Sequence, residues 1–182
     1  MGALRNDALY TYDDYCKWDN ADRCELIDGE IYGMSPAPIR RHQRISRELT
    51  LQLATFLKGK PCEVYAAPFD VCLNNNTVVQ PDLVVICDKS KLDDKGCVGA
   101  PDLVIEILSQ SSASRDRVLK FNQYLQAKVR EYWIVDPDSK TVTVNILDNN
   151  TKYYSAAYAE TDKAPVYVLD GCIIDLADVF AE

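Results

Sequence analysis

The stretch Pro101-Asp102-Leu103-Val104-Ile105-Glu106-Ile107-Leu108 decides how this sequence is interpreted. A short apolar run that begins at a proline is typical of a buried β-strand. The run holds one carboxylate between two isoleucines, at Glu106. A carboxylate among aliphatic side chains costs free energy to bury unless it has a partner. We therefore expect a functional site at Glu106.

A second Pro-Asp-Leu-Val sequence occurs at Pro81–Val84, so two aspartates compete as the partner of Glu106. Asp102 lies on the same strand as Glu106, about 13 Å away if that strand is extended. Carboxylates that share a Mg²⁺ ion must lie closer, because each ligand oxygen is about 2 Å from the ion. Asp82, on a separate strand, can lie alongside. The sequence predicts Asp82 and Glu106 as metal ligands and Asp102 as a loop or strand-start residue. A plain turn role for Asp82, after a proline, is the alternative.

Three helices are expected from apolar spacing and capping residues. Residues 11–19 fit a short opening helix capped by Thr11. Apolar residues recur at helical spacing between Arg40 and Lys58, and Gly59 ends that segment. A third helix is expected from about Ser114 to Lys128, with Ser112 or Ser114 as its cap. Its apolar stripe consists of Val118, Phe121, Leu125 and Val129.

The predicted strands outnumber the helices. Asp28-Gly29 between two strand-like runs predicts an N-terminal β-hairpin. Further strands are expected at 64–73, 78–86, 103–108, 131–135 and 141–147, with finishing strands at 166–169 and 172–174. This order predicts an α/β (α+β) fold in which helices flank a mixed β-sheet. We expect one domain over residues 1–182, with residues 1–23 as an N-terminal extension that carries the short helix.

The composition restricts the metal and the compartment. Among seven cysteines and one histidine, no cysteine pair has the spacing of a zinc or redox motif. We interpret most of the cysteines as small buried hydrophobes in a reducing compartment. Any metal should be a hard ion bound by oxygen, Mg²⁺ or Mn²⁺. We recognise no apolar run long enough to span a membrane and no secretory signal, so the cytoplasm is expected.

The charge distribution indicates where a nucleic acid could bind. A net charge of −8 makes a general coat for DNA improbable. A local basic cluster nevertheless opens the helix at Arg40, and consists of Arg40, Arg41, His42, Arg44 and Arg47. Positive side chains at a helix start oppose the helix dipole, and a phosphate backbone would compensate. Arg41, His42 and Arg44 are therefore predicted to contact DNA, with a solvated helix face as the alternative.

Several segments resemble known nucleases. Asp82 after a proline, followed by a strand with Glu106, resembles the PD-(D/E)xK nuclease pattern. More narrowly, the chain is similar to the Uma-type restriction-endonuclease family from about residue 24 to its end. The matching segments, in chain order, are Glu25–Glu30, His42-Gln43, Gly99–Ser109, Asp116-Arg117-x-x-Lys120-x-x-x-Tyr124 and Glu131–Pro137. This resemblance implies a restriction-endonuclease-like fold and a divalent-metal-dependent DNA endonuclease.

The resemblance also implies roles for single residues. Leu108 stands where the broad pattern has a lysine, and Lys120 on the next helix takes its place. Lys120 would orient or deprotonate the attacking water or neutralise charge on the phosphate, and Tyr124 would position the phosphate or the lysine. The carbonyl of Ile107 would add a metal ligand. Helical geometry puts Lys120 about 140° from the centre of the apolar stripe, so it does not face the core. Asp116, Lys120 and Tyr124 nevertheless share one flank of the helix at i, i+4 and i+8, and that flank could face the sheet edge with the carboxylates. A solvated Asp–Lys helix pair is the alternative.

Two questions remain open at this level. A further carboxylate could come from Glu25, Glu30 or Glu48, which the sequence does not rank. The chain could also be an inactive nuclease-fold module that binds nucleic acid, or a regulatory homodimer. A homodimer is expected for the enzyme as well, because a double-strand cut usually needs two active sites. Cleavage that depends on the metal would distinguish the enzyme from the other two.

Overall fold

The computed structural model describes residues 9–18, 24–34, 38–109 and 113–181, with only the backbone over 113–117. The helices are α1 (Tyr12–Tyr15), α2 (Arg40–Leu57), α3 (Ala113–Gln126) and α4 (Leu176–Phe180). The strands are β1 (Cys24–Ile27), β2 (Glu30–Gly33), β3 (Glu63–Ala66), β4 (Asp70–Asn74), β5 (Thr77–Val79), β6 (Leu83–Ile86), β7 (Gly96–Val98), β8 (Leu103–Ile107), β9 (Glu131–Asp136), β10 (Thr141–Asp148), β11 (Lys152–Ala159), β12 (Lys163–Pro165) and β13 (Ile173–Asp175). None of the described helices is long and apolar enough to cross a membrane.

The strands form two large sheets, where the sequence predicted one. The six-stranded sheet has the order β11-β10-β9-β8-β6-β3, and the five-stranded sheet has the order β2-β1-β5-β4-β7. Both sheets mix parallel and antiparallel pairs, since β8 pairs with β9 and β4 with β7 in parallel. The predicted mixed α+β fold is therefore confirmed, with its strands divided between two sheets. The small pair β12-β13 forms a third sheet.

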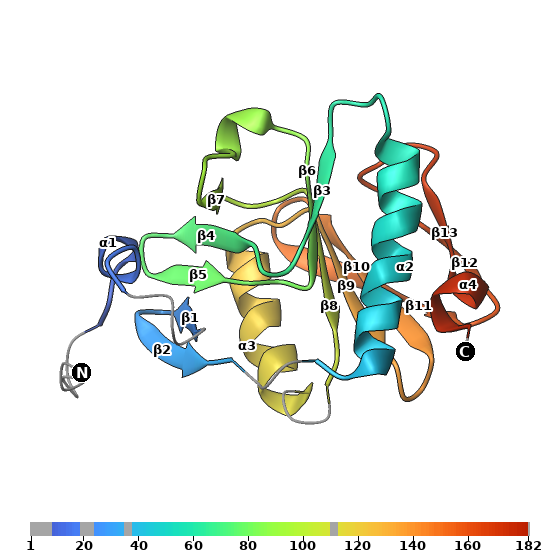
Figure 1. Ribbon diagram of the computed structural model, residues 1–182, viewed down its shortest axis with the longest axis horizontal. Coiled ribbons are helices and arrows are strands. Elements are labelled where there is room, and N and C mark those ends of the chain that lie inside the picture. Colours follow the sequence, from blue (N-terminus) through green and yellow to red (C-terminus); the bar gives the residue numbers. More distant parts are fainter. Residues whose placement is uncertain (1–8, 19–23, 35–37, 110–112, 182) are drawn as a thin grey trace.

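Helices α2 and α3 lie on opposite faces of the six-stranded sheet (Figure 1). On one face, Leu49 and Leu53 of α2 pack with Leu83 and Ile105. On the other face, Tyr124 of α3 packs with alternate residues of the same strands. Successive strand residues point to opposite faces, which is why adjacent apolar residues serve two different core clusters. A strand covered on both sides reads as a continuous apolar run.

Helix α3 also lies against the five-stranded sheet (Figure 1). Its Tyr124 shares a core cluster with Ile27, Val71 and Val79 of that sheet. The helix is thus packed between two sheets and buries more than one side. The apolar stripe predicted from the sequence is not the face that the helix buries: Val118, assigned to that stripe, is 64% exposed, whereas Lys120, Gln123 and Tyr124 are buried.

Two of the predicted strands are each two shorter strands in the structure, because the chain crosses from one sheet to the other within them. The predicted strand 64–73 is β3 in the six-stranded sheet followed by β4 in the five-stranded one. The predicted strand 78–86 is β5 followed by β6, on the return path. Pro68 and Pro81 lie at the two breaks, and a proline cannot donate a ladder hydrogen bond. Asp82 therefore stands where the chain re-enters the six-stranded sheet.

The local signals near the N-terminus are confirmed. Asp28 and Gly29 have φ values of 52° and 82° and join β1 to β2 as a hairpin, because Gly and Asp tolerate positive φ. Thr11 caps α1, and Asp14 returns a hydrogen bond to it. Helix α2 ends at Leu57, as expected. Ser114 lies inside α3 rather than capping it, and Ser112 lies outside the described residues.

The C-terminal part differs from the prediction. Strand β11, which pairs with β10 along its whole length, was not predicted. No strand forms at 166–169; the tail instead holds β12, β13 and α4, and buries Val166 and Leu169 against the six-stranded sheet. Residues 166–169 are apolar because they pack, not because they join a sheet.

The cysteines are only partly as expected. Cys72, Cys97 and Cys172 are free and buried, whereas Cys16 is exposed. Cys62 and Cys87 form a disulfide, a pairing that the sequence analysis did not predict. The β3–β6 register, which pairs Glu63 with Ile86, makes these two cysteines direct neighbours across the strands. The cytoplasmic compartment stays a prediction.

Candidate active site

Asp82 and Glu106 face each other across two neighbouring strands. The antiparallel register pairs Leu83 of β6 with Ile105 of β8, so the next position outward pairs Asp82 with Glu106. Opposed residues of an antiparallel pair have Cα atoms about 5 Å apart and project to the same face. Asp82 Oδ2 accepts a 2.7 Å hydrogen bond from the backbone N–H of Ile107.

Glu106 is buried and has two partners on α3. Its Oε1 accepts hydrogen bonds from Lys120 Nζ at 3.0 Å and from the Tyr124 hydroxyl at 2.6 Å. Burial raises the pKa of Glu106 to about 7, against the opposing effect of Lys120 and with the help of Asp82 and Glu25. Both of these printed bonds go to the same oxygen of the carboxylate, Oε1.

Lys120 contacts Glu106, on the flank that it shares with Tyr124, but it is buried, whereas helical geometry predicted a residue that does not face the core. The side chain is 6% exposed and lies between the two sheets. The expectation assumed that the buried face of α3 is apolar, whereas Lys120, Gln123 and Tyr124 form that face. The i, i+4 spacing of Lys120 and Tyr124, noted in the sequence, directs both side chains to Glu106.

Glu25 is the additional carboxylate that the structure brings to the site. It lies on β1, and its Oε1 is 2.9 Å from Lys120 Nζ and accepts a 2.8 Å hydrogen bond from the Gln80 backbone. Glu30 instead accepts a bond from the Tyr32 hydroxyl, and Glu48 one from Gln52. Neither makes a described contact with the cluster.

The sequence offered one signal for this choice. In the sequence, Glu25 precedes Leu26 and Ile27, so it is a second carboxylate in an apolar run. In the structure its side chain is only 7% exposed.

His42 belongs to the site rather than to the outer surface of α2. It is buried, and its Nε2 lies 3.2 Å from Asp82 Oδ1. Burial lowers the pKa of His42, but the hydrogen bond to Asp82 and the nearby negative charge raise it overall. Its Nδ1 is buried without a hydrogen-bond partner among the described residues. His42 therefore holds one oxygen of Asp82 while Ile107 holds the other.

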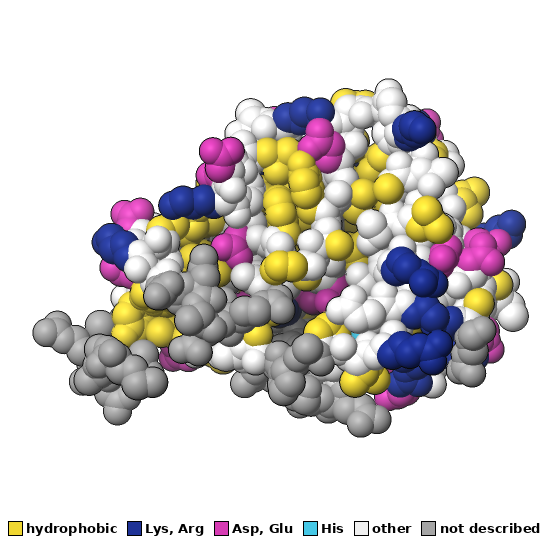
Figure 2. Space-filling view, viewed as in Figure 1, with side chains coloured by type: hydrophobic (Ala, Val, Ile, Leu, Met, Phe, Trp, Pro, Cys, Tyr) yellow, Lys and Arg dark blue, Asp and Glu magenta, His cyan; other side chains and the backbone are white. Residues whose placement is uncertain are grey.

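The arginines of α2 lie on the opposite side of this helix from its buried residues. Basic side chains gather over α2 in Figure 2. Arg40 and Arg47 are exposed, and Arg44 is half-buried. Arg41 pairs with Asp138, which neutralises part of its charge. No acidic residue stands in the first turn of α2 to offset the arginines.

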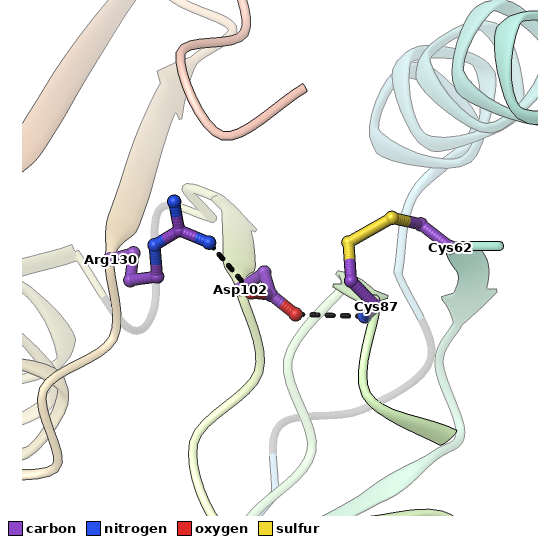
Figure 3. The surroundings of a disulfide bond; sticks show 4 residues. All are labelled: Cys62, Cys87, Asp102 and Arg130. Carbon is purple, nitrogen blue, oxygen red and sulfur yellow. Dashed lines mark hydrogen bonds and ion pairs between the residues drawn. A yellow bond between two sulfur atoms is a disulfide. The ribbon is translucent and has the colours of Figure 1, made fainter. Parts of the chain in front are cut away.

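Asp102 lies outside the site, as predicted. It sits just before β8, and Figure 3 shows it between Arg130 and the disulfide-bonded Cys87. Its Oδ2 accepts a 2.8 Å hydrogen bond from the Cys87 backbone, and its Oδ1 pairs with Arg130 at 3.1 Å. Both oxygens are therefore occupied with joining strand ends. The side chain of Asp116, from the matching segment on α3, lies outside the described residues.

The donor set fits a hard divalent cation. No three His, Cys, Asp or Glu side chains in the described part of the chain converge as metal ligands. A zinc site needs three or four such ligands. Mg²⁺ is usually bound through only one or two protein carboxylates and keeps several water ligands. Asp82 and Glu106, a pair of carboxylates in opposed positions of neighbouring chain segments, fit that requirement. The Ile107 carbonyl follows directly after Glu106 and is the expected backbone ligand.

Several known proteins are similar to this chain in sequence. The family model of Uma2, described as "Putative restriction endonuclease", matches residues 11–177. The uncharacterized protein slr1290 of Synechocystis sp. is 26% identical over 155 residues, which are 83% of this chain and 81% of that protein. The uncharacterized protein sll1609 of the same organism is 28% identical over 119 residues, 63% of this chain and 67% of that protein.

A solved structure shares the fold. The crystal structure of a "putative nuclease belonging to DUF820" from Anabaena variabilis superposes with a TM-score of 0.77. The match covers 94% of this chain and 97% of that one at 20% identity. At this identity the likeness establishes the fold alone.

Proposed function

This chain belongs to the Uma2 family of restriction-endonuclease-like proteins, and on that premise we propose that it is a metal-dependent endonuclease that hydrolyses phosphodiester bonds in DNA. One observation carries the proposal: opposed carboxylates, Asp82 and Glu106, next to a buried lysine, Lys120. A bound Mg²⁺ or Mn²⁺ would supply Lewis-acid polarisation of the phosphate and lower the pKa of water. Asp82, Glu106 and the Ile107 carbonyl would hold it.

The side chains around the carboxylates have separate roles. Lys120, whose amine contacts both Glu25 and Glu106, is suited to neutralising charge that develops on the phosphate. Tyr124 fixes the rotamer of Glu106 through its hydroxyl. His42 fixes Asp82 from the side of α2. Because both carboxylates are held before any ligand arrives, little ordering is needed when the ion binds.

Lys120 also answers the absence of a lysine at position 108. In the family pattern, Leu108 replaces the usual lysine, and an inactive fold was the alternative interpretation. The amine of Lys120, on α3, lies 3.0 Å from the carboxylate of Glu106, the residue two positions before Leu108. This contact favours the enzyme over a module that only binds nucleic acid.

The arginines of α2 support DNA as the substrate. His42 lies on the same helix as Arg40, Arg44 and Arg47, so one helix links the Asp82 carboxylate to a basic surface (Figure 2). A phosphate backbone bound along that surface would lie next to the helix whose other side holds Asp82, with an affinity that falls as salt rises.

Cleavage of plasmid DNA tests the proposal. The purified protein should convert supercoiled plasmid to nicked or linear DNA with Mg²⁺ or Mn²⁺ and stop when EDTA is added. Glu106→Gln should reduce cleavage to background while the variant remains folded. Glu48→Gln, on the same helix as the basic surface but outside the cluster, is the matched control and should cleave normally. DNA binding without cleavage under all metals would instead indicate an inactive nuclease fold.

Strand β11 supports assembly as a homodimer, which we include in the proposal. It is an eight-residue edge strand with no charged residue or proline between Tyr153 and Ala159. Long unguarded edges are templates for further pairing. A symmetric antiparallel pair centred on Ala156 would place Lys152 opposite Glu160 of the partner. Sedimentation equilibrium should show a dimer, and Ala156→Glu, which opposes two like charges, should give a monomer; a monomeric wild type would contradict this assembly.

A further inference from the structure

Lys120 occupies the space between two carboxylates of the site. Its Nζ is 2.9 Å from Glu25 Oε1 and 3.0 Å from Glu106 Oε1. Nucleases that use two metal ions place them about 3.5–4 Å apart, with carboxylates around both. We propose that the Lys120 ammonium takes the place of a second metal ion, so that this site binds a single divalent cation through Asp82 and Glu106. The inference rests on the proposed metal-dependent function and specifies its stoichiometry.

The geometry keeps Glu25 away from the metal. Glu25, Asp82 and Glu106 do not converge as a three-ligand group, as no such group exists among the described side chains. The Oε1 atom of Glu25 already accepts two contacts, from Lys120 Nζ and from the Gln80 backbone. Glu25 lies on the five-stranded sheet, whereas Asp82 and Glu106 belong to the six-stranded one. Glu25 is therefore a positioning residue for Lys120.

Charge balance gives the same count. With all three carboxylates ionised, as they would be around a bound cation, Glu25, Asp82 and Glu106 together with the Lys120 ammonium sum to −2, before any charge on His42 is counted. One divalent cation neutralises this cluster. A second divalent cation would leave two uncompensated positive charges in a buried site, which is strongly unfavourable.

Burial makes the competition between the ammonium and a metal decisive. Glu25, Glu106 and Lys120 are all less than a tenth exposed. Two charges at such short distances repel or attract each other far more strongly in a buried, low-dielectric site than in water. A divalent ion between Glu25 and Glu106 would have to displace the ammonium, and the buried amine would lose both of its carboxylate partners.

Calorimetric titration with Mn²⁺ counts the ions directly and does not depend on cleavage. The wild type should bind one ion. Lys120→Met removes the amine and keeps the length of the side chain, so a second ion should bind between Glu25 and Glu106. The double variant Lys120→Met with Glu25→Gln should return to one ion. Lys58→Met, at an exposed lysine, is the matched control and should bind one ion, like the wild type.

Glu25→Gln alone should also keep one ion, since Glu25 is not a ligand. This variant and the wild type decide the matter if Lys120→Met does not fold, as judged by circular dichroism. Two ions in the wild type, or loss of the ion in Glu25→Gln, would overturn the inference while leaving a nuclease possible. Absence of any Mn²⁺ binding would overturn the inference together with the proposed function.

Discussion

Replacing Glu106 with glutamine should change how the stability of the metal-free protein depends on pH. Glu106 is buried, and burial raises its pKa from 4.5 to about 7. The folded protein thus keeps a proton on this carboxyl up to about pH 7, whereas the unfolded chain loses it near pH 4.5. Because the folded state binds more protons in this interval, the free energy of unfolding falls as pH rises through it.

The size of the effect follows from the shift. A difference of about 2.5 pH units at about 1.4 kcal/mol per unit gives a loss of about 3–4 kcal/mol. The contribution of Glu106 to the free energy of unfolding is fully present below pH 4.5 and is lost by about pH 7. Glutamine can still accept the hydrogen bonds of Lys120 and Tyr124 but does not ionise, so Glu106→Gln should lack this loss.

Urea unfolding between pH 5 and 8 in the presence of EDTA measures the difference. The wild type should lose stability relative to Glu106→Gln as pH rises, and saturating Mn²⁺ should restore only the wild type, because an ion that binds the folded state alone stabilises it. Glu48→Gln should follow the wild type. Parallel curves for the wild type and Glu106→Gln would refute the reasoning, because Glu106 would then ionise normally.

Three further substitutions test other parts of the structure. Tyr124→Phe removes the 2.6 Å hydrogen bond to Glu106 and should cost about 1–3 kcal/mol in urea unfolding and raise the pKa of Glu106 further; an unchanged midpoint would contradict this. Arg44→Ala should lower the slope of log affinity for DNA against log salt by about one, and Arg41→Ala by less, because an aspartate already pairs with Arg41; equal slopes would exclude a phosphate contact. Glu131→Ala should cost about 2–4 kcal/mol, since Glu131 is buried and accepts bonds from an indole and from a tail amide; a thermal midpoint near that of the wild type would disprove that role.

The sequence predicted the pairing of Asp82 with Glu106 because local rules suffice for it. Strand geometry alone excludes Asp102 and leaves Asp82 as the partner. The Asp28-Gly29 hairpin and helix α2 were equally accessible, since turn chemistry and helical spacing are local. The prediction of a single sheet was wrong, because the apolar pattern of a strand does not say which sheet it joins.

Long-range packing decided the rest of the site. Lys120 was expected on a flank of α3 that does not face the core. It is buried because α3 lies between two sheets and buries a polar face as well as an apolar one. Glu25 could not be ranked above Glu30 and Glu48, since its contact with Lys120 joins residues almost a hundred positions apart, on different layers. The Cys62–Cys87 disulfide depends in the same way on the β3–β6 register.

Anomalous diffraction from crystals of this protein soaked in Mn²⁺ tests the central claim most directly. The account predicts one peak within bonding distance of a carboxylate oxygen of Asp82 and of Glu106, with Lys120 still between Glu25 and Glu106. A peak that contacts neither carboxylate, or none at all in crystals that hold Mn²⁺ at saturating concentration, would contradict it.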